Sequence, residues 1–272
     1  MSAGTVYLMY HEIAMPGRPL CQDEEGYVRY VVPQNIFREQ IGRLAANGYR
    51  GLSVTEALDR NQNRDCNQNH VRNQKHERAI AITFDDGCRT DLLTAAPLLK
   101  EVGFNSTFYI VEGFINGRGY LTGEQVKELH RQGFEIGCHS MTHSYLTDLS
   151  SERLMVEIAV AKERLEQLIG ERVDHFSCPG GRWSPAVARL AQEVGYRTVA
   201  TSRIGINLPD TDPYRLSRVA VMRDTSIDDF DRVCRAEGLL LKQARYATLA
   251  AVKGMLGNTV YERVRSRVLD RS

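Results

Sequence analysis

Two adjacent carboxylates, Asp85 and Asp86, follow an apolar run and come directly before a glycine. Like charges repel each other, and a carboxylate at the end of a buried strand loses hydration, so the pair predicts a bound cation or a proton in transfer. Two histidines, His139 and His143, follow a second apolar run in the segment CHSMTH. A Pro-Gly-Gly turn follows a third run, in CPGGRW.

Two histidines and one carboxylate are a common ligand set for a catalytic zinc or similar divalent ion. One of the two aspartates can bind the ion while the other stays free as a general base, because the ion lowers the pKa of an attacking water to about 7. Taken alone, an Asp-Asp-Gly segment is typical of a turn. The prediction therefore depends on all three segments, each of which follows a predicted strand.

Strands and helices alternate along the chain and determine where these segments lie. Strands are predicted over residues 5–12, 79–84, 105–111, 134–140, 174–180, 197–202 and 214–222. Helices are predicted over residues 34–49, 92–103, 122–133, 151–170, 184–195 and 226–241. This alternation predicts an α/β fold of about seven parallel strands, closed like a barrel. Chemistry in such a barrel lies at the carboxyl ends of the strands, so the three segments are expected to meet at one mouth.

The chain has 272 residues, of which 42% are hydrophobic, and a formal net charge of +1. This balance gives no electrostatic reason to expect a nucleic-acid partner. We predict a catalytic barrel over residues 1–238, into which a polar loop, residues 59–78, is inserted. Residues 239–272 predict a basic amphipathic helical extension, which packs on the barrel or lies on a membrane surface.

The first 17 residues lack a basic region followed by a long apolar segment, so we expect a cytoplasmic protein. Peripheral contact with the inner membrane surface applies only to the alternative in which the extension lies on a membrane. The six cysteines show no CxxC spacing, which favours reduced thiols. Cys88, Cys138 and Cys178 each adjoin one of the three segments. They could form a cysteine metal site, but small buried residues at strand ends are the expected interpretation.

Together, TFDDG, HSMTH and CPGG resemble the first three signature motifs of the polysaccharide deacetylase family, carbohydrate esterase family 4. The likeness covers about residues 5–235, since LMYHEI and FREQIGRLAANGYRGLSVTEAL also resemble members that act on exopolysaccharides or surface glycans. The resemblance implies a distorted (β/α) barrel and a hydrolase that removes N-acetyl or O-acetyl groups from a carbohydrate, most simply an acetamido sugar in a glycan or glycan precursor.

By the same resemblance, Asp85 is the general base, and Asp86, His139 and His143 hold one divalent metal ion. Zinc is the expected ion, although cobalt, nickel, manganese or iron would also suit this ligand set. The resemblance implies that metal-bound water attacks the acetyl carbonyl. A backbone N–H near Gly180 would help to stabilise the oxyanion that forms.

The chain departs from the family pattern in its third and fifth motifs. The third motif usually carries an arginine two residues before the proline, where it pairs with the base, but this chain has Ser177, and Arg182 or Arg218 could substitute. The fifth motif supplies a late histidine as general acid, but the last histidine here is His175. We therefore predict that His11 serves as the acid or as a substrate ligand, and the alternative is a buried histidine bonded to backbone.

The fourth motif, an Asp-Trp pair, is not evident in the chain. The single tryptophan is Trp183, which either stacks on a sugar or packs in the interior. Arg182, beside it, is a further candidate substrate contact. Two other functions stay open on the sequence: a metal-dependent amidase or deformylase acting on a non-sugar amide or a lipid-linked sugar, and a catalytically inactive carbohydrate-binding relative.

Overall fold

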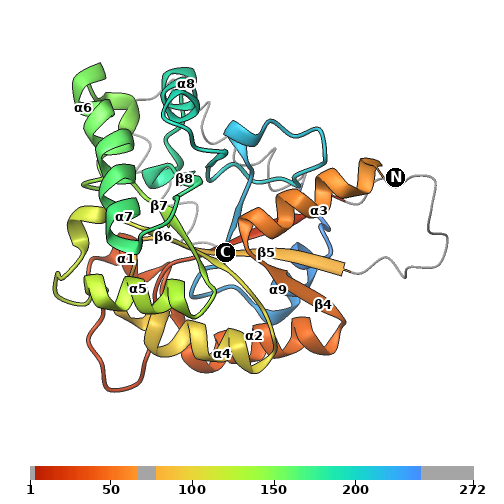
Figure 1. Cartoon of the computed structure of the whole chain (residues 1–272). Coiled ribbons are helices and arrows are strands. Elements are labelled where there is room, and N and C mark those ends of the chain that lie inside the picture. Colours follow the sequence, from red (N-terminus) through yellow and green to blue (C-terminus); the bar gives the residue numbers. More distant parts are fainter. Residues whose placement is uncertain (1–3, 67–77, 240–272) are drawn as a thin grey trace, which may run out of the picture.

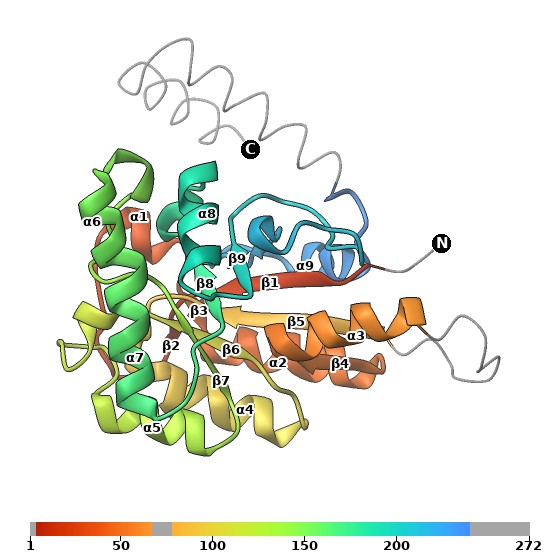
Figure 2. The ribbon, with the colours of Figure 1, turned by 45° about the horizontal axis from the view of Figure 1, so that its top comes forward.

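Most of the parallel strands form one curled sheet with most of the helices on its outer side, whereas α3 (Val54–Cys66) packs against residues of its inner face (Figures 1 and 2). This computed structural model describes residues 4–66 and 78–239, with side chains described for 4–61 and 78–239. The strand order is β10 (Val219–Ala220), β1 (Val6–Tyr10), β5 (Arg78–Phe84), β6 (Thr107–Ile110), β7 (Glu135–Cys138), β8 (His175–Ser177) and β9 (Thr198–Ala200). The first half of β5 also pairs with β4 (Tyr49–Leu52), and β2 (Ile13–Ala14) pairs with β3 (Val32–Pro33).

Helices fill most connections between the strands. They are α1 (Glu25–Val28), α2 (Gln34–Ala46), α3 (Val54–Cys66), α4 (Ala96–Glu101), α5 (Gly123–Arg131), α6 (Ser151–Met155), α7 (Ala161–Ile169), α8 (Pro185–Glu193) and α9 (Ile227–Cys234). One turn of π-helix, Asp91–Ala95, leads into α4, and another, Val156–Val160, joins α6 to α7. Figure 1 shows α2, α4 and α5 side by side along one outer side of the sheet.

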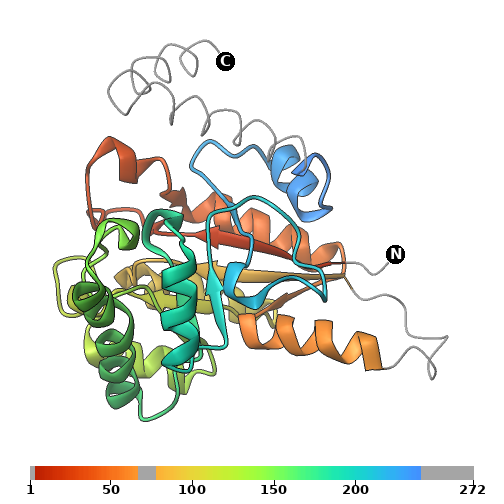
Figure 3. The same cartoon turned by 90° about the horizontal axis from the view of Figure 1, so that it is seen from above.

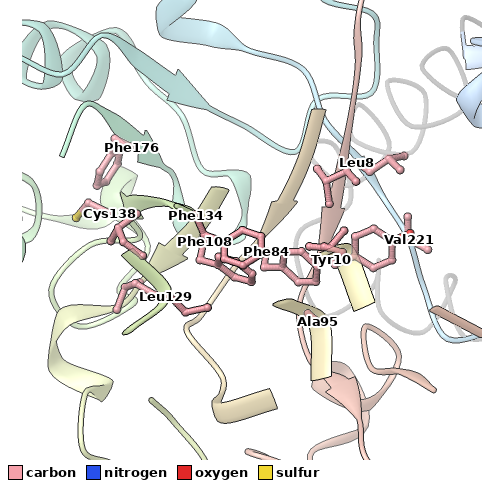
Figure 4. Close-up of a cluster of buried hydrophobic side chains, with 14 of the residues drawn as sticks. Leu8, Tyr10, Phe84, Ala95, Phe108, Leu129, Phe134, Cys138, Phe176 and Val221 are labelled. Carbon is pink, nitrogen blue, oxygen red and sulfur yellow. The ribbon is translucent and has the colours of Figure 1, made fainter. Parts of the chain in front are cut away.

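A row of aromatic rings on the helix-facing side sets the strand register (Figure 4). Tyr10, Phe84 and Phe108 are direct cross-strand partners on β1, β5 and β6, with ring centroids 5.4 and 4.8 Å apart. Side chains alternate between the two faces of a strand, so the residues that follow these rings point to the inner face. On β5, this alternation turns Asp85 inward.

The sheet closes through the segment that leads into β10. Leu216 bridges to Ala200 of β9, and three residues later Val219 pairs with Leu8 of β1. β1 pairs with β10 on one side and with β5 on the other, and Figure 3 shows the view of these strands from above. The predicted distorted barrel of parallel strands is therefore confirmed. The strand predicted over 214–222 is shorter than expected, because Pro213–Arg215 forms a 3-10 turn.

The predicted polar loop, residues 59–78, is wrong at its start, because α3 continues to Cys66. Ser53 and Glu56 form a capping box: the Ser53 N–H donates to Glu56 Oε2 over 2.8 Å, and the Glu56 N–H donates to Ser53 Oγ over 3.3 Å. The carboxylate of Glu135 also accepts the Val54 N–H at 3.0 Å. A negative charge at a helix N-terminus is stabilising, so these contacts support a helix that is poor in apolar residues.

The rest of that loop, residues 67–77, lies outside the described residues, as does the predicted C-terminal extension from residue 240 onward. Its membrane contact, the domain boundaries and the cytoplasmic location therefore stay predictions. Within residues 4–66 and 78–239, no helix is both long and apolar enough to cross a bilayer.

Candidate active site

The carboxyl ends of four strands bring the predicted site residues together. The Asp85 N–H donates to the Tyr10 carbonyl over 2.9 Å, which places Asp85 beside His11 at the ends of β5 and β1. The His139 N–H donates to the carbonyl of Ile110, the last residue of β6, over 2.8 Å. The third segment follows β8 directly. The sequence-based prediction of one shared mouth agrees with this arrangement.

Arg218 forms a bidentate ion pair with Asp85 inside the barrel. Its Nη1 donates to Asp85 Oδ1 over 2.7 Å and its Nη2 to Asp85 Oδ2 over 2.8 Å. The same guanidinium donates to Ser177 Oγ (2.7 Å), Thr83 Oγ1 (3.2 Å) and the Thr201 carbonyl (3.0 Å). Of the two arginines considered from the sequence, Arg218 therefore occupies the position beside Asp85. Ser177, where the family carries its arginine, contacts both members of the pair.

Asp86, His139 and His143 present three ligand atoms to one point, all within 4.8 Å of one another. Asp86 Oδ1 lies 3.6 Å from His139 Nε2 and 3.4 Å from His143 Nε2. This buried oxygen has no hydrogen-bond partner among the described residues. Asp86 (φ 81°) and His143 (φ 61°) both adopt left-handed backbone, which is uncommon for residues other than glycine and clusters at functional sites. The three side chains fit a divalent metal ion.

Local contacts prepare the histidines as neutral ligands. His139 Nδ1 lies 2.9 Å from the Ser177 carbonyl, a partner that requires N–H at Nδ1 and leaves the lone pair of Nε2 facing Asp86. Burial lowers the pKa of His139 to about 3 and also lowers the pKa of His143. Both imidazoles are therefore neutral at physiological pH, as metal ligation requires.

The two aspartates differ in charge environment. Burial by itself raises the pKa of Asp85, but Arg218 and then His139 outweigh it and hold this pKa well below its ordinary value. Burial raises the pKa of Asp86 to about 6, although the electrostatic effect of His11 lowers it. Asp85 is thus a fixed carboxylate, whereas Asp86 gains most from a nearby cation.

Glu157 holds the loop that carries the histidines, and the sequence analysis did not single it out. Its carboxylate accepts hydrogen bonds from the N–H groups of Met141 (3.0 Å) and Thr142 (2.8 Å) and from the Thr142 hydroxyl (2.6 Å). Glu157 belongs to the π-helical turn Val156–Val160, and π turns are frequent at functional sites. A buried glutamate in an otherwise amphipathic helix was the available signal.

His11 lies at this site as predicted, next to Asp85 at the strand ends. Its ring packs at 4.6 Å from the ring of Tyr30, and its buried Nδ1 has no hydrogen-bond partner in the described part of the chain. Among the charged groups, His11 also has the largest effect on the pKa of Asp86, which it lowers. The alternative of a histidine bonded to backbone through this nitrogen has no support here.

The third segment places its three candidates differently. Gly180 adopts φ 58° in the turn Pro179–Gly181 at the mouth. Trp183 is half-buried: its Nε1–H donates to the Tyr214 carbonyl over 2.7 Å and the Arg215 guanidinium lies 4.5 Å from its ring. Arg182 is exposed and lies 4.9 Å from the ring of Tyr145. Packing therefore accounts for the contacts of Trp183.

The cysteines beside the motifs are buried, as expected for small residues at strand ends. Cys138 and Cys178 belong to the apolar core. Cys88 lies with Cys21 and Glu12 in a second group whose potential ligand atoms are within 4.8 Å of one another. There the Tyr27 hydroxyl lies 2.9 Å from Glu12 Oε2 and 3.1 Å from Cys88 Sγ, so hydrogen bonds already engage these groups.

The chain is similar in sequence to known proteins. Residues 72–199 match the family model described as polysaccharide deacetylase. The chain is 29% identical over 215 residues to YxkH of Bacillus subtilis, covering 79% of this chain and 70% of that protein. It is 36% identical over 128 residues to the peptidoglycan-N-acetylglucosamine deacetylase of Bacillus cereus, covering 47% of this chain and 58% of that protein. Residues 72–199, just under half of the chain, thus resemble the polysaccharide deacetylase family, and the similarity to YxkH extends beyond them.

A solved structure shows the same fold. The Streptococcus pyogenes deacetylase PplD, in complex with acetate, superposes with a TM-score of 0.71 over 86% of this chain and 99% of that one, at 21% identity. The polysaccharide deacetylase match contains Asp85, Asp86 and both site histidines, but His11 and Arg218 lie outside it. His11 directly follows β1 and Arg218 directly precedes β10, and these two strands are neighbours in the sheet.

Proposed function

We propose that this chain is a metal-dependent carbohydrate deacetylase that hydrolyses the N-acetyl group of an acetamido sugar in a glycan or glycan precursor. The observation that carries the proposal is the division of the Asp85–Asp86 pair. Arg218 holds Asp85 as a permanent carboxylate, whereas Asp86 turns an unpartnered oxygen toward His139 and His143. A general base and a ligand set therefore lie side by side, in a family whose named members are deacetylases.

Asp86, His139 and His143 would hold the ion, with zinc as the expected metal. A divalent ion bound there supplies Lewis-acid polarisation of the acetyl carbonyl and lowers the pKa of water. Asp85 accepts the proton of the attacking water, and Arg218 keeps its carboxylate oriented and unprotonated.

The amine that leaves must gain a proton, and His11 would supply it. His11 is the candidate acid because it directly follows β1 and lies next to Asp85, at the same carboxyl-end mouth as the metal-site histidines, and it lowers the pKa of both aspartates. The backbone N–H of Gly180, in the left-handed turn at the mouth, would stabilise the oxyanion.

The test is acetate release from acetylated chitooligosaccharides and from a nucleotide-linked acetamido sugar, using metal-stripped protein with and without added zinc or cobalt. Simple N-acetyl and N-formyl amides without a sugar serve as the comparison substrates. We expect release that depends on added metal and on the sugar. Metal-dependent hydrolysis of the simple amides alone would favour a non-sugar amidase, and metal binding without any hydrolysis would favour an inactive relative.

A further inference from the structure

An exposed tyrosine stands at the lip of the site. Tyr145 follows the metal-site residue His143 by two positions, a separation that the chain can span only over about 7 Å. Its side chain is 49% exposed, although large apolar rings are usually buried. Tyr145 belongs to the loop after β7 and packs against Gly180 in the loop after β8, at the carboxyl ends of both strands.

Two contacts fix the orientation of this ring. A Cβ atom added to Gly180 would lie 2.7 Å from Tyr145 Cε1, so the ring packs directly on the glycine backbone. The guanidinium of Arg182 lies 4.9 Å from the ring centroid, within the range of a cation–π interaction. Tyr145 is thus held in place by the third segment while about half of its surface stays open to solvent.

We propose that Tyr145 forms an aromatic subsite that binds the pyranose ring next to the sugar that is deacetylated. This inference rests on the proposed function and names the substrate contact that the predicted Trp183 does not supply, because Trp183 is engaged by Tyr214 and Arg215. A fixed aromatic ring offers a large apolar face at a low cost in conformational entropy, and the C–H face of a pyranose is complementary to it.

Position decides which part of a substrate the ring meets. Asp85, Asp86 and His139 are buried at the centre of the mouth, whereas the side chain of His143 is partly exposed and Tyr145 lies beside Gly180. A sugar whose acetyl group reaches Asp85 would therefore extend its neighbouring residue over the Tyr145 ring. The enzyme should accordingly prefer an oligosaccharide to a single acetamido sugar.

The experiment compares kcat and KM for N-acetylglucosamine and for its acetylated tetramer in wild type, Tyr145→Phe and Tyr145→Leu. Phe keeps the aromatic face and should keep the preference for the tetramer. Leu keeps an apolar side chain of moderate size without that face, and should raise KM for the tetramer about five- to tenfold while kcat changes little. Leu208→Ala is the matched control, since Leu208 is an equally exposed apolar residue (44%) that contacts Gly4 before β1.

A Tyr145→Leu protein with wild-type metal content and melting temperature that keeps its KM for the tetramer would overturn the subsite and leave the deacetylase proposal intact. A loss of tetramer preference in Tyr145→Phe as well would assign the effect to the hydroxyl and would also overturn it. If wild-type protein with bound metal released no acetate from either sugar, the proposed function and the subsite would fall together.

Discussion

Arg218 and Asp85 lie 133 residues apart in the chain and join through two hydrogen bonds of 2.7 and 2.8 Å inside the barrel. The guanidinium is completely buried, so water cannot take the place of a partner that is removed. Removing one member of a buried ion pair typically costs 3–5 kcal/mol, because the other charge stays unpaired.

Arg218→Gln is therefore expected to lower kcat by about 100-fold, since Asp85 loses both its orientation and its stabilised charge. Metal content should be unchanged, because Arg218 contacts none of the three metal-site residues through the hydrogen bonds described. The same substitution in an Asp85→Asn background should cost much less stability than in the wild type, and chemical denaturation of the four proteins measures this coupling. Equal costs in both backgrounds would show that the pair does not act as a unit.

His11→Ala is expected to lower kcat by about 100-fold with little change in metal content, because protonation of the leaving amine would lose its donor. His130→Ala, which removes a histidine from the last turn of α5, is the matched control. Steady-state kinetics with the best substrate of the acetate-release panel makes the measurement. Full turnover in a folded His11→Ala protein would disprove the role of His11.

Glu157→Gln tests whether the π turn positions the histidine loop. The neutral amide can accept fewer of the three hydrogen bonds that Met141 and Thr142 donate, so the loop should hold His143 less firmly. We expect the affinity for metal, measured by competition with a chelator, to be about tenfold weaker. Glu157→Asp should not recover this affinity, because the shorter side chain cannot reach the N–H groups of Met141 and Thr142. Unchanged affinity would assign Glu157 to stability alone.

Glu135 gives the fold a pH dependence at the other end of the barrel. Burial opposes ionisation, but His175 and hydrogen bonds from Thr107 and Thr55 outweigh it and hold the pKa of Glu135 at about 2, below its ordinary 4.5. The pKa of Glu135 is lower in the folded protein than in the unfolded chain. The ionised carboxylate therefore stabilises the fold above about pH 4.5, and this stabilisation is lost as the pH falls through about 2.

Wild type should therefore exceed Glu135→Gln in free energy of unfolding by on the order of 3 kcal/mol at pH 7, and the gap should narrow as the pH is lowered toward 2. Urea denaturation across this range measures the gap. Glu101→Gln, which removes a solvent-exposed ion pair with Arg38, should change stability by less than about 1 kcal/mol. A gap for Glu135→Gln that does not depend on pH would contradict the assigned charge state.

Most of the order of strands and helices could be predicted from local sequence, and so could the meeting of the aspartate pair with His139 and His143, because strand ends of a parallel barrel share one mouth. The choice of Asp86 rather than Asp85 as the proposed ligand came from the family resemblance. The start of the polar loop was predicted wrongly because composition was read without the capping box of Ser53 and Glu56, which begins α3.

Choosing Arg218 over Arg182 required the fold. Arg182 is close to the third motif in sequence, but its guanidinium lies over Tyr145 at the surface. Arg218 is far away in sequence, and only the pairing of β10 with β1 brings it to Asp85. Long-range pairings of this kind leave no local signal. The choice between stacking and packing for Trp183 needed the fold for the same reason, since its contacts with Tyr214 and Arg215 are tertiary.

The most direct test of the account combines metal binding with acetate release in Asp85→Asn and Asp86→Asn. If Asp85 is the base and Asp86 a ligand, Asp85→Asn should bind one equivalent of zinc or cobalt and release acetate at least about 100-fold more slowly than wild type. Asp86→Asn should lose both metal and activity. Wild-type metal binding in Asp86→Asn, or wild-type acetate release by Asp85→Asn, would contradict the division of the two aspartates.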